Sequence, residues 1–407
     1  MWGEMIYFLR IKNKLLLGVM FTKHQRVSQK ISLLNQKRII KYIIEKKTAT
    51  RAEICRNLHI SFPAVSNIVS KLVEQGMIIQ KGKQSSSLGR KPISLTLNDK
   101  AATIAVAHVG YGELKISILD LCGSVLSTSH LSFARKSSFY TVIKMLRQHL
   151  SEMLEEFRST HGGTLGLAVA VPSPLDYVNN RLVKSRFYGW ENKTLPRRFN
   201  ILGKRVPIIW ENDSNMLALG ASRVFGSIKN LLAVYLGIGI GAGIIYDGKL
   251  YRGYNGMAGE IGQVLVPFGD KLKELERIVS EESLIAVARE HFDSIPDISG
   301  EELLNLLEKS ASEKEIIVKL DTISQTVSQF LAVLIAGICP ELVVFDGEVV
   351  RKCPTLTDMI LTKAQTYTRR DQSSFKIATA GKSLLLTGGY WLVVKNEFGL
   401  DDVQDLG

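Results

Sequence analysis

The sequence predicts an α/β protein in two parts, a small basic helical module followed by a much larger region. Residues 1–100 contain 19 Lys and Arg against 5 Asp and Glu, whereas the rest of the 407 residues contain 33 against 34. Within the basic part, apolar residues recur with the period of a helix. From Thr103 onward, apolar β-prone runs alternate with helical stretches such as Tyr140 to Phe157, which is the pattern of an α/β core.

The segment SFPAVSNIVSKLVEQGM, residues 61–77, predicts a short helix with defined ends. Ser61 suits the N-cap, Pro63 is tolerated in the first turn, and Gly76 suits the C-terminal cap. One face carries apolar residues at i, i+3, i+4, i+7 and i+8, and the opposite face carries small or polar ones. The apolar face is Val65, Ile68, Val69, Leu72 and Val73, and the outward residues are Ala64, Asn67, Ser70 and Lys71.

The flanking sequence predicts a winged helix-turn-helix. Upstream, one helix ends at residues 45–47, and a second, capped by Thr48 or Thr50 with Glu53 completing a capping box, runs through Ile54. Two short helices joined by a tight turn form a helix-turn-helix. Downstream, MIIQKG and KPISLTLN predict two strands around the loop KQSSSLGR. The tip of this wing is basic, with Lys81, Lys83, Arg90 and Lys91.

Basic charge and a short exposed helix together favour binding to DNA over a merely solvated basic surface. Lys and Arg supply sequence-independent attraction to phosphates, and small side chains allow the helix to approach base edges. The candidate DNA-binding residues are Ser61, Ala64, Ser66, Asn67, Ser70, Lys71, Arg90 and Lys91.

Length and composition divide the chain into residues 1–30, an extension; 31–100, the winged helix-turn-helix; and 101–407, a large domain of two lobes. The extension is apolar but interrupted by charges, so no membrane span is expected, and translation from Met1 or from Met20 would both give a sensible protein. The four cysteines show no paired spacing, which favours a reducing cytoplasm.

Three stretches of the large domain resemble the ROK (repressor, open reading frame, kinase) family. They are ENDSNMLALG at 211–220, LGIGIGAGIIYDGKLYRGYNGMAGEIGQ at 236–263 and CPELVVFDGEVV at 339–350. The resemblance covers about residues 30 to 395 and includes the N-terminal module, so it points to the repressor branch of xylose-repressor and N-acetylglucosamine-repressor type. It implies a two-lobed actin-like, hexokinase-like (ribonuclease H-like) fold.

Where the chain departs from the kinases of this family, it predicts that the domain is not an enzyme. Kinases of the family carry an Asp-x-Gly-Gly-Thr phosphate motif, and the similar stretch here is His108-Val109-Gly110-Tyr111-Gly112. Phosphoryl transfer depends on positioning and charge neutralisation, which the lost carboxylate and hydroxyl supplied. We expect His108 to be a packed or surface histidine, and the Gly237–Gly243 run to form a tight hairpin rather than a phosphate cradle. Asp346 replaces a usual glycine and is assigned no ligand.

The sugar-contacting positions that the resemblance implies are partly altered. Asp213 is similar to the family's catalytic base and Glu260 to its second sugar-contacting carboxylate, although Asn212 and Asp213 would also cap the following helix. Gln263 stands where the family has a His for sugar and zinc, and no cysteine cluster follows, so no cofactor and no zinc are expected. Packing by Val264, Leu265, Val266 and Phe268 would replace the metal. The candidate sugar-binding residues are Ser173, Asn212, Asp213, Glu260 and Gln263, with Phe187 as a stacking surface.

These features predict a cytoplasmic transcriptional repressor of carbohydrate-utilisation genes that binds operator DNA and a sugar or sugar-phosphate effector, as a homodimer or tetramer. Two alternatives stay open. The altered positions 173, 187 and 263 favour a ligand-independent core that binds a protein partner, as the resemblance allows. Retention of Asp213 and Glu260 favours weak sugar kinase activity.

Overall fold

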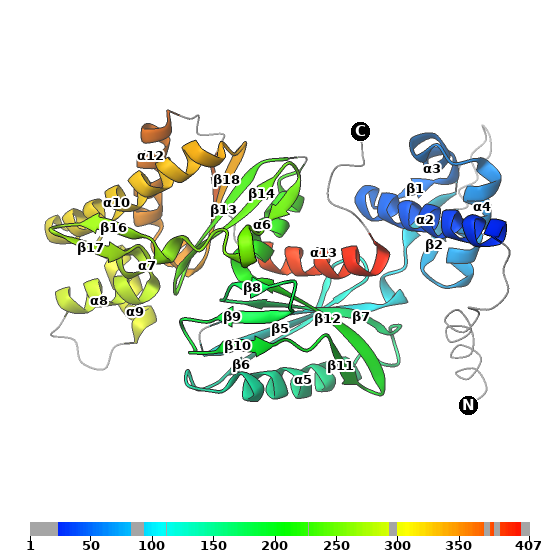
Figure 1. Cartoon of the computed structure of the whole chain (residues 1–407), viewed down its shortest axis with the longest axis horizontal. Helices are drawn as coiled ribbons and strands as arrows, with labels where there is room; N and C mark the ends of the chain where they lie inside the picture. Colours follow the sequence, from blue (N-terminus) through cyan, green and yellow to red (C-terminus); the bar gives the residue numbers. More distant parts are fainter. Residues whose placement is uncertain are drawn as a thin grey trace. The chain divides into compact units, whose positions relative to one another are not determined.

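The computed structural model describes residues 23–82, 93–110, 112–226, 228–292, 299–369, 375–377 and 383–399. Its backbone divides into two compact units (Figure 1), one with residues up to Asn98 and one with residues from Asp99 to Glu397. The proposed extension, residues 1–30, lies outside the described part of the chain except for the start of the first helix at Lys23.

The first unit is a winged helix-turn-helix, as predicted. Thr50 is the N-cap of α3: its hydroxyl accepts from the Glu53 amide (3.2 Å), and its amide donates to the Glu53 carboxylate (2.7 Å). The helix runs through Ile54, as predicted, and continues to Leu58, whose carbonyl accepts from Arg38. The helices are α2 (Lys23–Lys46), α3 (Arg51–Leu58) and α4 (Phe62–Glu74).

Helix α4 has the predicted apolar face. Val65, Ile68, Val69 and Leu72 are buried, and Val73 is half-buried. Gly76 follows the last turn with φ +71°, a conformation that glycine adopts without strain, and the Met77 amide closes the end by donating to Leu72 O. Ser61 occupies the N-cap position with an extended backbone, but its hydroxyl makes no capping hydrogen bond.

The wing strands also form as predicted. Strand β2 (Ile78–Lys81) pairs antiparallel with β3 (Ser94–Leu97), and β1 (Ala49–Thr50) adds a third strand that the sequence did not indicate. Of the predicted basic tip, Lys81 is exposed at the end of β2. Lys83, Arg90 and Lys91 lie outside the described residues.

The first lobe of the second unit contains a six-stranded sheet of order β11-β12-β7-β4-β5-β6. Strands β4, β7 and β12 run parallel, so their carboxyl ends meet at one edge. Helix α5 (Phe139–Glu155) packs on this sheet by an apolar face that includes Phe139, Val142 and Leu146. The strands are β4 (Thr103–Val109), β5 (Glu113–Asp120), β6 (Val125–Ser132), β7 (Thr164–Val171), β11 (Arg198–Ile201) and β12 (Lys204–Asn212), with a small sheet of β8 (Leu175–Asp176), β9 (Arg181–Lys184) and β10 (Glu191–Thr194).

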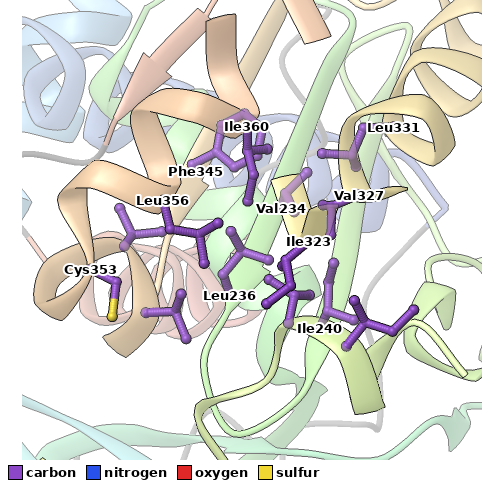
Figure 2. Packing of buried hydrophobic residues seen from close by; sticks show 14 of the residues in the cluster. Val234, Leu236, Ile240, Ile323, Val327, Leu331, Phe345, Cys353, Leu356 and Ile360 are labelled. Carbon is purple, nitrogen blue, oxygen red and sulfur yellow. The ribbon is translucent and has the colours of Figure 1, made fainter. Parts of the chain in front are cut away.

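The second lobe contains a five-stranded sheet of order β15-β14-β13-β18-β19. Val234, Leu236 and Phe345 of this sheet pack against Val327 and Ile360 of the covering helices (Figure 2). The strands are β13 (Leu231–Leu236), β14 (Ile240–Tyr246), β15 (Lys249–Tyr251), β18 (Leu342–Asp346) and β19 (Phe375–Ile377), with a ribbon of β16 (Leu265–Phe268) and β17 (Lys271–Glu274). The helices are α7 (Glu276–Val279), α8 (Glu281–His291), α9 (Gly300–Lys309), α10 (Lys314–Ile338), α11 (Glu348–Lys352) and α12 (Pro354–Thr368).

Helix α10 is long and apolar enough to cross a membrane by length and composition. In the structure it is a core helix of the second lobe: Leu320, Ile323, Val327, Leu331 and Ile335 form one buried face. Packing accounts for this face, whereas Val318 and Val333 outside it are 59% and 74% exposed.

Helices α6 (Asp213–Val224) and α13 (Leu384–Phe398) come into contact at two glycines. A Cβ on Gly220 would overlap the carbonyl of Leu384, and a Cβ on Gly388 would overlap the carbonyl of Met216. The absence of side chains lets the two backbones touch. This contact fixes α6, whose first residue lies in the candidate site.

Candidate functional site

The candidate DNA interface is the exposed face of α4. Ser61, Asn67, Ser70 and Lys71 are exposed, as predicted, whereas Ala64 and Ser66 are half-buried. No acidic residue lies in the first turn of α4, so its N-terminal amides carry an unopposed partial positive charge. Arg90 and Lys91 lie outside the described residues, so their assignment stays a prediction.

Phe62, at the start of α4, is a feature that the sequence reasoning missed. Its side chain is 57% exposed, next to the exposed Ser61. The helical period places it on the apolar face, three residues before Val65, so the period predicted burial and not exposure. An exposed aromatic ring at the N-terminus of this helix extends the candidate DNA interface.

The candidate ligand site is a cavity of about 390 Å³ lined by both lobes of the second unit. All five predicted sugar-binding residues line it, and so does Phe187. The first lobe contributes the ends of β4, β7 and β12, where the parallel strands of the sheet terminate. Ligand-sized cavities at such strand ends are common in α/β proteins.

Asn212 and Asp213 have separate roles. Asn212 is the N-cap of α6, with its side-chain oxygen accepting from the Asn215 amide at 3.1 Å. Asp213 is the first residue of the helix and is buried at the cavity wall, where its Oδ1 accepts from the Ser214 amide at 2.7 Å. Burial raises the pKa of Asp213 to about 6, against the opposing effect of the Ser214 hydrogen bonds. Capping therefore accounts for Asn212 and leaves the Asp213 carboxylate for a ligand.

Glu260 and Gln263 line the cavity on the second-lobe side. The Gln263 amide donates to Glu260 Oε2 at 2.9 Å, which holds the carboxylate in place. Burial and the nearby charge of Asp213 raise the pKa of Glu260 to about 7. Two carboxylates that influence each other in one cavity form a set of acceptors for neighbouring hydroxyl groups.

Ser173 and Phe187 shape the first-lobe side. Ser173 is 2% exposed, and its hydroxyl donates to Pro174 O at 3.2 Å. Its carbonyl accepts from Asn212 Nδ2 at 3.4 Å. The half-buried Phe187 ring lies against the turn between β13 and β14, since a Cβ on Gly239 would be 2.9 Å from its ring. The ring can offer a flat apolar surface to one face of a sugar.

His108 lies in the cavity wall, half-buried, at the end of β4. Burial lowers its pKa to about 4, although the Glu348 carboxylate acts in the opposite direction. The imidazole is therefore neutral at physiological pH. It provides no charge like that of the carboxylate found at the similar position in the kinases.

The glycine-rich run forms a tight hairpin, as predicted, with Gly237 N donating to Gly239 O across the turn from β13 to β14.

Asp346, at the end of β18, forms an ion pair with Arg351. Glu348 accepts a hydrogen bond from Tyr235 at 2.6 Å and pairs with Arg351 at 2.9 Å. Tyr235 and Glu348 both line the cavity, and the sequence reasoning assigned neither of them.

The segment after Gln263 is stabilised differently from the expectation. Val264 and Leu265 are 40% and 58% exposed, so the prediction that they pack in place of a zinc ion is wrong. Only Val266 is buried, and Phe268 packs partly against the core. The strands β16 and β17 pair with each other instead, because backbone hydrogen bonds can hold a ribbon whose outer side chains stay in water.

Two carboxylates at the end of this ribbon bind Arg186 of the first lobe. Arg186 contacts Glu274 at 2.7 Å and Glu276 at 2.8 Å. Within the described ranges, no group of three or more His, Cys, Asp or Glu side chains could hold a metal ion. The four cysteines form no disulfide.

Glu211 holds in place the connection between β12 and α6, at which Asp213 lies. It is 1% exposed and accepts from Arg252 Nη2 (2.6 Å), from the side-chain amide of Asn215 (3.1 Å) and from Tyr177. Tyr177 belongs to the first lobe and Arg252 to the second, so this buried carboxylate joins both lobes behind the site. A charged residue at the end of an apolar strand was the signal available in the sequence.

The geometry defines a class of protein: a DNA-binding winged helix-turn-helix joined to a two-lobed, sugar-kinase-like domain. The ROK family model matches residues 104–396, and a winged helix-turn-helix DNA-binding model matches residues 34–79. The chain therefore belongs to the ROK family.

Named relatives include repressors. The xylose repressor of Staphylococcus xylosus is 24% identical over 91% of this chain and 97% of its own length. The xylose repressor of Caldicellulosiruptor bescii is 26% identical over 63% of this chain and 66% of its own length. A crystal structure of a ROK family transcriptional regulator, a homolog of the E. coli MLC protein, matches with a TM-score of 0.70 and 18% identity over 90% of this chain and 96% of that one. This last likeness shows the fold.

Proposed function

We propose that this chain is a sugar-responsive transcriptional repressor that binds operator DNA through α4 and a carbohydrate through Asp213 and Glu260. One observation carries the proposal: the chain that presents an exposed helix-turn-helix also keeps two carboxylates facing a single cavity. Relatives named as xylose repressors support it and make xylose the first sugar to test.

The cavity suits a polyhydroxyl ligand. Carboxylates accept hydrogen bonds from hydroxyl groups, and charged acceptors form stronger hydrogen bonds than neutral ones. Asp213 and Glu260 would bind adjacent hydroxyls, Gln263 would hold Glu260, and Phe187 would pack on the apolar face of the ring. Ser173 supports Asn212 through its carbonyl and adds little polar surface, because its hydroxyl already donates to Pro174 O.

Binding without phosphoryl transfer fits these residues better than kinase activity. Asp213 alone could accept a proton from a sugar hydroxyl. Transfer also needs a metal-side carboxylate and groups that neutralise phosphate charge, whereas His108 is neutral and Glu348 is acidic. The residues His108 and Glu348 therefore support a regulator that lacks catalytic turnover.

The ligand would act by favouring the closed arrangement of the two lobes over the open one. A sugar that contacts both Phe187 of the first lobe and Glu260 of the second binds the closed cleft more tightly than the open one, so it shifts the population toward closure. In a homodimer, this shift would change the spacing of two DNA-binding helices and their fit to two half-sites.

The experiment combines ligand and DNA binding. Thermal unfolding of the purified chain is followed with xylose, other sugars and ATP, since a ligand of the native state raises Tm. Stabilisation by one sugar and not by ATP supports the sensor, and stabilisation by ATP supports the kinase. If none of these ligands raises Tm and the chain still binds tightly to the intergenic DNA beside its own gene, a protein partner is favoured as the effector.

A further inference from the structure

One wall of the cavity, formed by the end of β13 and the start of α11, carries a tyrosine and an acidic side chain. Tyr235, at the end of β13, folds back over the hairpin turn: a Cβ on Gly237 would lie 2.5 Å from its hydroxyl. That hydroxyl donates to Glu348 Oε2 at 2.6 Å. Gly347 has φ +128° and packs on the carbonyl of Leu236, so the turn from β18 to α11 directs Glu348 into the same space.

Glu348 carries a charge there. Burial alone would raise its pKa, but the Tyr235 hydrogen bond and the positive charge of Arg351 outweigh burial and lower it. The carboxylate is therefore ionised at neutral pH. Its charge acts on Asp213, raising the pKa of that carboxyl, and on His108.

The neighbouring cations are engaged by carboxylates. Arg351 is shared between Asp346 and Glu348, and Lys352 pairs with Glu281 at 3.2 Å. Eight of the side chains that line the cavity are Asp or Glu, against four Lys or Arg. The side of the cavity next to Asp213 is thus negative and has its amide turn covered by a phenol ring.

We propose that Glu348 is a specificity-determining residue that restricts the cleft to uncharged, unphosphorylated carbohydrates. The inference rests on the proposed sugar-binding function and names the ligand class. A phosphate on the hydroxyl held by Asp213 would place about 1.5 to 2 negative charges beside two carboxylates. Anions are bound by exposed backbone amides and by Arg or Lys forks, and this wall presents a tyrosine and a carboxylate in their place.

The test compares matched ligands by calorimetry on the full chain. The pairs are glucose with glucose 6-phosphate and N-acetylglucosamine with its 6-phosphate, together with xylose. For a sugar that binds, the wild type should prefer the neutral form by at least 100-fold. Glu348→Gln keeps the hydrogen-bonding shape and removes the charge, and it should reduce that preference at least tenfold. Glu301→Gln removes another carboxylate that lines the cavity, on α9, and should leave the preference intact.

Equal binding of the phosphorylated and neutral forms by the wild type, or an unchanged preference in Glu348→Gln, would overturn the assignment. If neither form of any sugar binds, the proposed sugar-sensing function is wrong. Inorganic pyrophosphate then tests separately whether Glu348 excludes anions from the cavity. Pyrophosphate should raise the Tm of Glu348→Gln and leave that of the wild type unchanged. A variant that gains no pyrophosphate binding would refute the role given to this carboxylate.

Discussion

Arg186 of the first lobe and Glu276 of the second form an ion pair in the lining of the cavity, with Nη1 2.8 Å from Oε1. The same guanidinium binds Glu274 at 2.7 Å, at the end of the ribbon that follows Gln263. Arg186 precedes Phe187 in the chain, and Glu276 belongs to α7 beside the Glu260 loop. The ion pairs therefore connect the two candidate sugar-binding walls directly.

Arg186→Ala should destabilise the second unit by about 1–2 kcal/mol, because Glu276 loses its ion pair and Glu274 keeps only the pair with Arg277. A decrease of a few degrees in Tm is the expected readout. Arg158→Ala is the matched control: Arg158 pairs with Glu155 on the exposed face of α5 and should cost less than about 0.5 kcal/mol. Equal decreases in stability in the two variants would show that the ion pairs between the lobes stabilise the protein no more than an exposed surface pair does.

Gly388→Ala should unfold or strongly destabilise the protein, by more than about 2 kcal/mol, since the added Cβ would overlap the carbonyl of Met216. Gly337→Ala in α10 meets open space and should stabilise the protein by about 0.5–1 kcal/mol through helix propensity. Urea unfolding of both variants checks the pair. The free energy of unfolding should fall in Gly388→Ala and rise in Gly337→Ala. A Gly388→Ala protein as stable as the wild type would argue against the α6–α13 contact.

Affinity for a neutral sugar should increase as pH rises from about 5 to 8. The raised pKa values of Asp213 and Glu260, about 6 and about 7, leave both groups protonated at the lower end and ionised at the upper end. The ionised forms are the stronger acceptors of sugar hydroxyls. His108 titrates at about 4, below this window. Calorimetry across the pH range measures the trend; in Glu260→Gln the upper part of the increase should disappear, and a flat wild-type profile would contradict the assignment.

Lys71→Ala should weaken binding to all DNA sequences and reduce the slope of log affinity against log salt concentration by about one, as expected for the loss of one phosphate contact. Asn67→Ala should instead cost about 1–3 kcal/mol on the preferred sequence and little elsewhere. Lys249→Ala removes an exposed lysine of β15 and serves as the control. Fluorescence anisotropy over a salt series distinguishes these outcomes.

Periodicity and capping were sufficient to predict the winged helix-turn-helix, because its helices are defined by local signals such as Thr50 with Glu53 and the glycine at 76. The sequence also placed Asp213 and Glu260 in one cavity through family resemblance. It missed Glu348, Tyr235 and Arg186, since their roles arise from contacts between segments far apart in the chain. The packing expected of Val264 and Leu265 failed because the ribbon is held by its own backbone pairing and by Val266 in the core, which leaves these two side chains exposed.

We propose that occupancy of the Asp213 cleft controls DNA binding. The affinity of the purified protein for the intergenic DNA beside its own gene should be measured with and without a saturating sugar, in the wild type and in Asp213→Asn. We expect the sugar to weaken DNA binding by the wild type at least tenfold and to have little effect on Asp213→Asn, which should bind the DNA without sugar as the wild type does. Unchanged DNA affinity in a wild-type protein that calorimetry shows to be saturated with sugar would contradict the claim.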